Sequence, residues 1–361
     1  MIFRSRRAKA PGPGALESET DPAALIAIAD AREAEGKVFP AIEAVRRANS
    51  LRRGDELERR LVRLRHRAGV RLTRRPSSQP SYPQPASRGN GGGSPGSTEL
   101  PVLEAGELTP ERVRAAILER GCVLVPGLIS SEEARILAGG IDRTFDAREA
   151  AERGAGPDQT APWFEELAPE RGYSLNTRGW VNDTGGVWVA DSPRMLFEVL
   201  ETFERAGLRE LVAGYLGERP ALSVDKCLLR RVAPTGGAEW HQDGAFLGKE
   251  TRALNVWMAL SPCGRDAPGL DVVPRRFEDV VETGTEGAVF GWSVSPQVVE
   301  RVSAGAGVVR PAFEPGDTLL FDHLFLHRTA TEPEMPNSRY AIESWFFGPS
   351  AFPKRYVPVA F

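Results

Sequence analysis

The chain has 361 residues, of which 41% are hydrophobic, and its formal net charge is −3. This length and composition supply enough apolar residues for one or more globular domains. No apolar run approaches the ~18 residues that a membrane helix needs, so the sequence excludes an integral membrane protein. The small negative charge is also unlike that of a polycation, and we expect no nucleic-acid partner.

The cysteines and the N-terminus bear on the compartment in which the protein works. Cys122, Cys227 and Cys263 are scattered and form no CxxC pair, which argues against a disulfide scaffold or a cysteine-based zinc site. The first 14 residues are basic but lack the apolar stretch of a secretory signal. Both features predict a cytoplasmic protein.

The first predicted unit is a helical module over residues 1–75. Asp21 followed by Pro22 is typical of a helix start, and Gly36 and Gly54 separate three helices, predicted at about 21–35, 38–50 and 57–70. The segment weakly resembles a single tetratricopeptide-type helical hairpin. No second copy follows, although such repeats are stabilised by stacked neighbours.

A stripe of arginines lies on the third of these helices. Arg59, Arg63, Arg67 and Arg71 recur every four residues and therefore share one helix face. One interpretation is a docking face for an acidic protein partner or nucleic acid. The other, which we favour, is a solvated face that rests on the acidic remainder of the chain.

Residues 76–100 predict a flexible linker. Proline, serine and glycine dominate this stretch and almost nothing in it is apolar, so it cannot bury enough surface to offset the entropy of ordering. The linker separates the helical module from a main domain at 101–361.

The main domain begins with helices and continues with strands. Thr109 and Ser130 are candidate N-caps for helices at about 109–120 and 131–147, a short strand follows Gly121, and a further helical pattern covers 195–216. From residue 221 the apolar segments are short, β-branched or aromatic, and are separated by turns. The order predicts an α+β fold whose strands form a barrel or a sandwich.

Histidine is scarce, and three of the four histidines fall in the β-rich region. His241 and Asp243 are two residues apart, so on a strand both would point to the same side. A third ligand could come from His323 or His327, and two histidines with one carboxylate suit non-haem Fe(II) with open positions. Arg339 opens the next strand, where its guanidinium can clamp a carboxylate.

Four segments together resemble the phytanoyl-CoA dioxygenase family of Fe(II)/2-oxoglutarate-dependent oxygenases. They are WHQDGAF (240–246), LNVWMAL (254–260), GDTLLFDHLFLHRTA (316–330) and NSRYAIESWFF (337–347), and the entry RGCVLVPGLISSEEA (120–134) fits as well. The resemblance spans about 101–361. It implies a double-stranded β-helix, or jelly roll, with flanking helices.

The resemblance also implies the site residues. The metal ligands and catalytic residues would be His241, Asp243 and His327, and His323 would lie behind the ligands or in the pocket. Arg339 would hold the distal carboxylate of 2-oxoglutarate. Further cosubstrate-binding residues would be Thr329, Asn255 and Trp257, where core packing is an equal alternative for Trp257. The implied cofactors are Fe(II), the cosubstrate 2-oxoglutarate and O2.

The substrate is not determined by the sequence. Family members frequently continue with Pro-Gly-Ser-His where this chain has Arg275-Arg276-Phe277, so we expect a different small-molecule or carrier-bound substrate. Because Asp243 is present, hydroxylation is favoured over halogenation. Candidate pocket residues are Arg178, Trp180, Trp188, Lys226, Arg230, Trp240 and Phe246. An alternative function is a scaffold that acts through the helical module.

Overall fold

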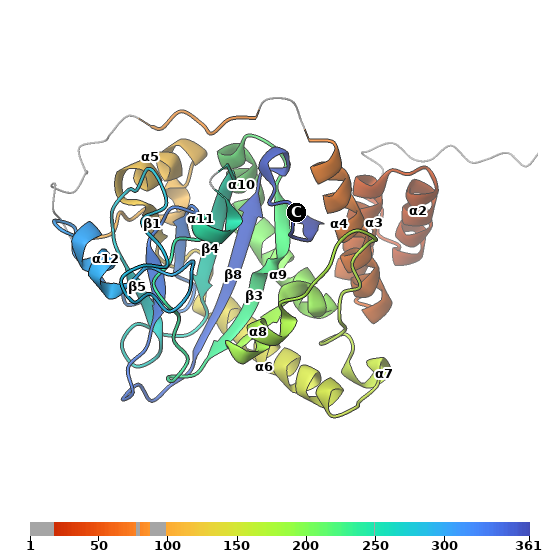
Figure 1. The fold of residues 1–361 in the computed structure, drawn as a ribbon. Helices are drawn as coiled ribbons and strands as arrows, with labels where there is room; N and C mark the ends of the chain where they lie inside the picture. The colour runs from red at the N-terminus through yellow and green to blue at the C-terminus, as the bar shows by residue number, and fades with distance from the viewer. Residues whose placement is uncertain (1–17, 77–79, 87–98, 249) are drawn as a thin grey trace, which may run out of the picture.

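The computed structural model describes residues 18–76, 80–86, 99–248 and 250–361, and combines helices with antiparallel β-sheet (Figure 1). Helices come first along the chain, and most of the strands follow residue 220. The mixture of helices and antiparallel strands agrees with the coarse fold class predicted from the sequence.

The described residues form both long and short α-helices. Their bounds are α2 (Pro22–Ala34), α3 (Val38–Leu51), α4 (Asp55–Arg74), α5 (Pro110–Arg120), α6 (Ser131–Glu152), α7 (Pro157–Thr160), α8 (Arg178–Asp183), α9 (Pro193–Arg205), α10 (Leu208–Leu216), α11 (Gly244–Leu247) and α12 (Pro296–Val302).

The strands form a seven-stranded sheet and a separate two-stranded sheet. The larger sheet has the order β1-β6-β4-β8-β3-β2, with β9 also paired to β3, and β5 pairs with β7 in the smaller one. Their bounds are β1 (Cys122–Val125), β2 (Gly186–Trp188), β3 (Ala221–Val232), β4 (Ala253–Ala259), β5 (Gly269–Val272), β6 (Thr318–Phe321), β7 (His327–Ala330), β8 (Arg339–Phe347) and β9 (Pro358–Ala360).

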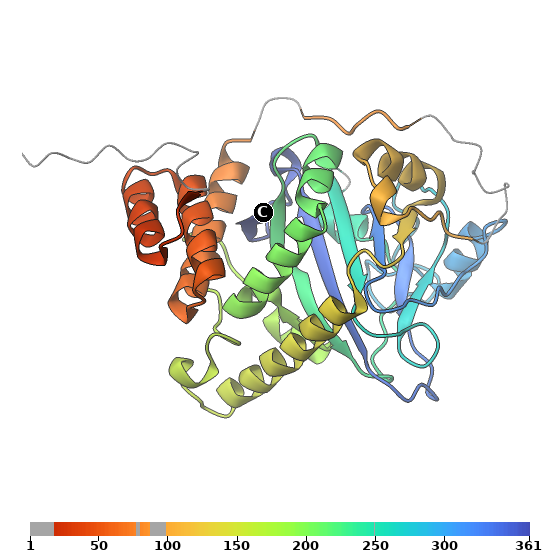
Figure 2. The same ribbon diagram turned by 180° about the vertical axis from the view of Figure 1, so that it is seen from behind.

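Helices cover one face of the large sheet, as Figure 2 shows for α6, α9 and α10. Their apolar side chains form one core with sheet residues such as Leu229, Val256 and Ile342. The other face carries a second core that includes Trp257, Phe321 and Trp345 and that reaches Leu270 and Val272 of β5. The second core therefore lies between the two sheets.

Capping side chains begin several helices where the sequence predicts them. Asp21 accepts a hydrogen bond from Ala23 N, Thr109 from Arg112 N and Ser130 from Glu133 N. The helical pattern at 195–216 is split into α9 and α10 at Gly207, whose φ of 72° lies in the left-handed region that glycine adopts without strain.

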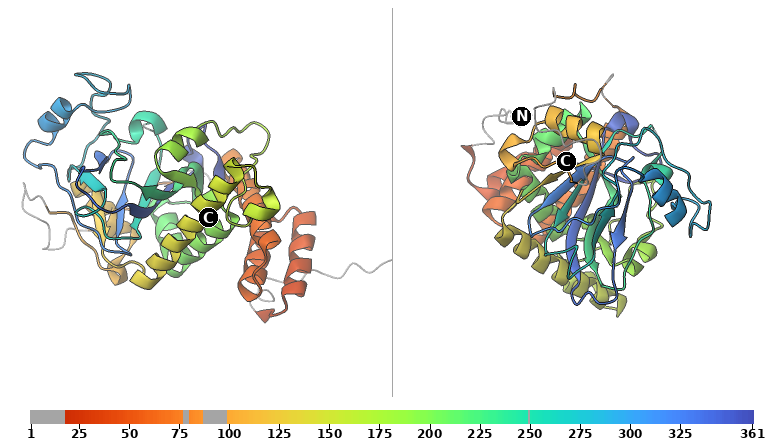
Figure 3. Two further views of the ribbon diagram at one scale, coloured as in Figure 1. Left: turned by 90° about the horizontal axis from the view of Figure 1, so that it is seen from below. Right: turned by 90° about the vertical axis from the view of Figure 1, so that its left-hand side faces the viewer.

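The three N-terminal helices pack against the end of the sheet where the chain terminates, opposite the end that carries α12 (Figure 3). Helix α4 lies against β9 and α9. The His66 ring joins α4 to two other segments, because Nδ1 lies 2.9 Å from Pro358 O and Nε2 accepts from Glu170 N at 2.9 Å. Burial lowers the pKa of His66, so the ring is neutral in this position.

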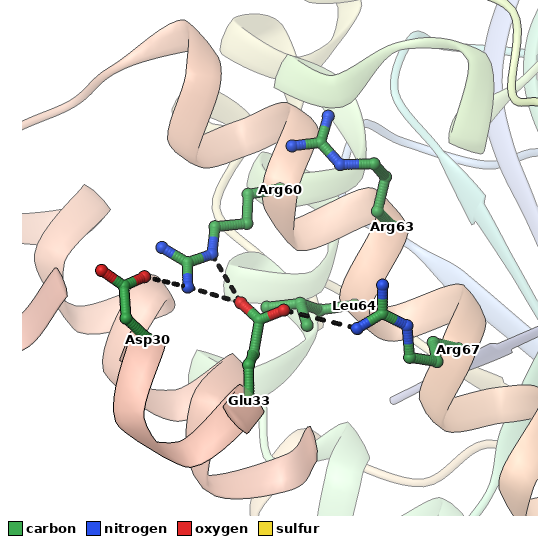
Figure 4. A pocket seen from close by; sticks show the side chains of 6 residues that line it. All are labelled: Asp30, Glu33, Arg60, Arg63, Leu64 and Arg67. Atoms are coloured by element: carbon green, nitrogen blue, oxygen red, sulfur yellow. Dashed lines mark hydrogen bonds and ion pairs between the residues drawn. The ribbon is translucent and has the colours of Figure 1, made fainter. Parts of the chain in front are cut away.

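The arginine stripe of α4 is engaged within the chain. Arg59 pairs with Glu165 at 2.7 Å, and Arg67 pairs with Glu33 of α2 at 3.3 Å. Figure 4 shows Arg60 and Arg67 on either side of the Glu33 carboxylate, in a hollow of about 280 Å³ between α2 and α4. The contact of Arg59 agrees with the favoured interpretation, in which the stripe rests on the acidic remainder of the chain, whereas Arg67 pairs with a carboxylate of the helical module itself.

Part of the predicted linker is held against the main domain, although most of 76–100 lies outside the described residues. Within 80–86, the Tyr82 ring contacts the Tyr215 ring at 5.2 Å and lies under the Arg114 guanidinium at 4.1 Å. The Tyr82 hydroxyl also accepts a hydrogen bond from Ala253 N at 3.3 Å. The division into domains at 75 and 100 stays a prediction.

The contact between α4 and β9 depends on a glycine. A Cβ at Gly69 would lie 2.7 Å from the Pro358 carbonyl and 2.9 Å from Val359 N, which are backbone atoms that cannot rotate away. We expect Gly69→Ala to destabilise the protein by about 1–3 kcal/mol in urea unfolding, because α4 must move off β9. Gly139→Ala is the matched control, since that helical glycine has open space around its Cβ and alanine there gains up to ~1 kcal/mol. Equal stability of the two variants would contradict the argument.

Two further features of the described residues concern their helices and their cysteines. Within the described ranges, none of the helices is both long enough and apolar enough to cross a lipid bilayer. All three cysteines are buried and free, and burial raises the pKa of Cys227 and of Cys263 to about 12. No disulfide links them, as the sequence predicts.

Candidate metal centre

Two histidines from distant parts of the chain lie next to each other because their backbones form hydrogen bonds. His241 N donates to His327 O at 2.9 Å and His327 N donates to His241 O at 3.1 Å. This isolated antiparallel bridge joins the segment before α11 to the start of β7. It brings the two imidazole centroids to 4.5 Å from each other.

Asp243 completes a group of three with these histidines. One ligand atom from each of His241, Asp243 and His327 lies within 4.8 Å of the others, and His327 Nε2 is 3.7 Å from Asp243 Oδ2. In the described part of the chain, this is the one cluster of three such residues placed to hold a metal ion. It consists of the three residues that the resemblance implies as ligands.

Hydrogen bonds fix which nitrogen of each ring is free. His241 Nδ1 lies 2.7 Å from Glu239 O, and His327 Nδ1 lies 3.0 Å from Phe325 O. A carbonyl only accepts, so each Nδ1 carries the proton and each Nε2 keeps its lone pair. Burial, followed by the neighbouring His327, lowers the pKa of His241 to about 3, which keeps that ring neutral near pH 7.

The residues between and after the ligands hold this arrangement. Gln242 is fully buried and points away from the group, since Nε2 donates to Leu324 O at 2.6 Å and Oε1 accepts from Val281 N at 2.7 Å. Gly244 N donates to His323 O at 2.7 Å, and a Cβ at Gly244 would meet that oxygen at 3.0 Å. The HxD segment is therefore tied to two loops.

His323, the alternative third ligand, is not part of the group of three. Its side chain is buried, and its ring Cδ2 faces Gly244, the residue after Asp243. The structure thus brings His327, and not His323, close to His241 and Asp243.

Arg339 is a buried cation that lies between the sheets. The residue is 1% exposed, and Nη1 donates to Gly269 O at 2.9 Å, but Nε has no hydrogen-bond partner among the described residues. No carboxylate of the described chain forms an ion pair with it. Burial, and then repulsion from Arg230, lower the pKa of Arg339 to about 10. A buried, unpaired guanidinium is costly and therefore indicates an anionic ligand.

Two of the other three predicted cosubstrate residues, Trp257 and Thr329, lie near Arg339. The Trp257 ring lies 5.5 Å from the Arg339 guanidinium and also packs on Phe313 at 4.8 Å, so it is part of the core, and its role in binding 2-oxoglutarate stays a prediction. Thr329 pairs with Leu270, one residue from the Gly269 carbonyl that Arg339 contacts. Asn255 is buried, and its Oδ1 has no partner among the described residues.

Several pocket candidates from the sequence turn out to be engaged elsewhere. Arg178 pairs with Asp191 through two hydrogen bonds of 2.9 and 3.0 Å, and its guanidinium covers the buried Trp188 ring. Trp180 is 53% exposed on α8. None of these three belongs to the metal group. Trp240, next to the ligand His241, is buried and lies under Arg328 at 5.0 Å.

Two residues next to the metal group were not identified from the sequence. Trp292 lies in a loop 51 positions after His241 in the chain, and the centroids of the two rings are 5.7 Å apart. Glu343 lies on β8 directly opposite Trp257 and acts electrostatically on His241 and Arg339. Of these two residues, only Glu343 could have been identified from the sequence. It is an even number of residues from Arg339, so both side chains lie on one face of the strand.

The donor set fits a transition-metal ion. Two neutral imidazoles and one carboxylate suit Fe(II) and leave coordination positions for other ligands. The free Nε2 atoms, and an Asp243 carboxylate that accepts no hydrogen bond from the described residues, are consistent with three ligand atoms kept for a metal.

One protein family and several solved structures are similar to this chain. Residues 117–332 match the phytanoyl-CoA dioxygenase family. No curated protein matches the chain. Similar solved structures include EctD from S. alaskensis with 2-oxoglutarate and 5-hydroxyectoine (17% identity, 77% of this chain and 86% of that chain covered, TM-score 0.46). Another is the non-heme alpha ketoglutarate dependent carbocyclase SnoK from nogalamycin biosynthesis (15%, 67% and 85%, TM-score 0.44).

Proposed function

Because the chain belongs to the phytanoyl-CoA dioxygenase family, we propose that it is an Fe(II)- and 2-oxoglutarate-dependent dioxygenase that hydroxylates a C–H bond. The substrate would be a small molecule, free or bound to a carrier. One observation carries the proposal. A His-Asp-His group with free ligand atoms lies between the same two sheets as a buried arginine that has no carboxylate partner among the described residues.

The metal would be held by His241, Asp243 and His327. Their backbone bridge and their Nδ1 hydrogen bonds pre-orient both imidazoles, so little reorganisation is needed on binding. The intact carboxylate of Asp243 favours hydroxylation, since a small residue there would vacate a metal position for a halide.

Arg339 would hold the distal carboxylate of 2-oxoglutarate, with Trp257 beneath the guanidinium. Thr329 and Asn255 would supply further polar contacts. When bound here with O2, Fe(II) and 2-oxoglutarate supply the oxidising chemistry, which amino-acid side chains lack. The apolar core around the site, including Phe321 and Trp345, keeps water away from it.

The proposal includes a double-stranded β-helix, in which the β5–β7 pair is the second sheet. The site supports this arrangement because one ligand, His327, lies on β7, while Arg339 of β8 reaches across to Gly269 of β5. The scaffold function that we considered as an alternative has less support, because the α4 arginines pair within the chain. A cytoplasmic location stays a prediction.

The test is an anaerobic titration of Fe(II)-loaded protein with 2-oxoglutarate. We expect the weak visible metal-to-ligand charge-transfer band of the Fe(II)–2-oxoglutarate complex, and slow 2-oxoglutarate consumption when O2 is admitted. Zn(II)-loaded protein is the control, because Zn(II) occupies the ligands without this transition. Folded, iron-replete protein that shows neither band nor turnover would refute the proposed function.

A further inference from the structure

A continuous set of aromatic rings leads from the metal group to the protein surface. The Phe246 ring stacks on His241 at 6.0 Å, and Trp292 meets both of these rings edge-on, at 5.8 and 5.7 Å. Phe290 then stacks on Trp292 at 4.9 Å with an interplanar angle of 8°. Phe290 is 47% exposed, so a flat apolar surface faces solvent beside the ligands.

The loop that carries these rings is held in place. Val294 N donates to Trp240 O at 2.8 Å, which ties the loop to the segment of the ligand His241. Gly284 N donates to Ser293 O at 2.9 Å, and the Ser293 hydroxyl bonds with both N and O of Phe290. Holding an exposed phenylalanine in one orientation next to a metal site prepares a binding surface at low entropic cost.

A lysine lies at the inner edge of the same surface. Lys226 Nζ is 4.1 Å from the centre of the Phe246 ring and 3.9 Å from Asp243 Oδ1. The lysine side chain is 16% exposed, and its ammonium makes no hydrogen bond to any described residue. Three N–H donors next to the metal group are thus available to a ligand.

The charged groups around the site are the cations Lys226, Arg230 and Arg339 and the carboxylates Asp225, Asp243 and Glu343. Fe(II) and 2-oxoglutarate carry equal and opposite charges, so their binding does not alter this balance. Arg339 would be taken by the cosubstrate, and Lys226 is the cation that contacts the aromatic surface.

We propose that Phe246, Phe290, Trp292 and Lys226 form the substrate subsite, and that it binds a flat, unsaturated molecule with one carboxylate. Aromatic rings attract other planar rings more strongly than their buried area alone explains. An aliphatic chain lacks this additional attraction and would gain only from burial. The Lys226 ammonium would pair with the carboxylate and place the planar body over Trp292, next to the metal. This inference rests on the proposed function.

The test uses 2-naphthoate as a probe of the full chain loaded with Mn(II). 2-Oxoglutarate is kept saturating so that Arg339 is not open to the probe. We expect paramagnetic broadening of the naphthoate proton signals in NMR, which reports closeness to the metal. Cyclohexanecarboxylate, which is not flat, and 2-naphthylmethanol, which is not charged, should both bind more weakly.

Variants separate the two parts of the subsite. We expect Trp292→Leu and Phe246→Leu each to weaken 2-naphthoate binding about 2- to 10-fold. Lys226→Met should weaken it about 10-fold or more and leave 2-naphthylmethanol binding unchanged. The matched controls Trp180→Leu and Lys37→Met change an exposed tryptophan and an exposed lysine elsewhere, and should bind as the unchanged protein does.

Two results would overturn the subsite. One is the lack of broadening by Mn(II) in protein whose Fe(II) form does show the 2-oxoglutarate charge-transfer band. The other is equal loss of binding in the Trp180→Leu control. If the charge-transfer band itself is absent, the proposed function fails first, so the two failures are distinguishable.

Discussion

Replacing His327 with alanine is expected to lower 2-oxoglutarate turnover by more than about 100-fold and to remove the Fe(II)–2-oxoglutarate charge-transfer band. The reason is geometric, because His327 is the residue that reaches both His241 and Asp243. Loss of residues that merely orient a ligand already costs roughly 10- to 100-fold, and loss of the ligand itself should cost more. His241→Ala and Asp243→Ala should behave in the same way.

His323→Ala is the matched control, because it removes a buried histidine four positions away on the same segment. We expect this variant to keep the charge-transfer band and to lose only thermal stability, since its side chain is not in the group of three. Anaerobic absorption spectra and melting curves of both variants make the comparison. A band that persists in His327→Ala and vanishes in His323→Ala would reverse the assignment of the third ligand.

The choice between these two histidines illustrates what the sequence determines. The pattern HxD predicts that His241 and Asp243 point to one side if both lie on a strand, but in the structure Asp243 has helical φ and ψ just before α11. The pattern alone could not identify the third ligand. His323 and His327 are four residues apart, so on a strand both would point to the same side. In the structure β6 ends at Phe321, so His323 lies in the turn before β7 and this argument does not apply to it.

Local signals predicted the elements better than the contacts between them. Caps at Asp21, Thr109 and Ser130 depend on neighbouring residues, and the helices begin there. Strands β2 and β9 have three residues each and were missed, because such short segments exist only through their pairing with β3. The α4–β9 contact could not be predicted from the sequence either, because a glycine such as Gly69 within a helix normally indicates only lower helix stability.

Substrate recognition was the least predictable part for the same reason. In the sequence Arg178 is a candidate for binding an anionic substrate. In the structure it pairs with Asp191, which follows α8 and β2 in the chain. Trp292 carried no signal in the sequence, and its edge-on contact with His241 involves a loop that the hydrogen bond from Val294 N to Trp240 O holds in place. Such pairings are decided by tertiary structure and leave no periodic signal in the chain.

Replacing Arg339 with methionine is expected to raise the KM for 2-oxoglutarate about 10- to 150-fold, which is the range for losing a charge-assisted hydrogen bond of roughly 1.5–3 kcal/mol. Methionine keeps the apolar stem that packs over Trp257 and removes a buried charge that forms no ion pair with a described carboxylate. Metal-free Arg339→Met should therefore melt at the same or a higher temperature than the unchanged protein.

For Arg339→Met we expect weaker 2-oxoglutarate binding but no loss of thermal stability in the metal-free protein. A residue that only supported the fold would show the reverse, so the two measurements together identify the role of Arg339. In the unchanged protein, Fe(II) with 2-oxoglutarate should raise the melting temperature, because a ligand that binds only the folded state stabilises it. In Arg339→Met that 2-oxoglutarate-dependent rise should largely disappear. Arg310→Met is the control, since Arg310 pairs with Asp271, which Arg328 also holds. If Arg339→Met lowers the melting temperature and leaves the KM for 2-oxoglutarate unchanged, Arg339 supports the fold and another cation binds the cosubstrate.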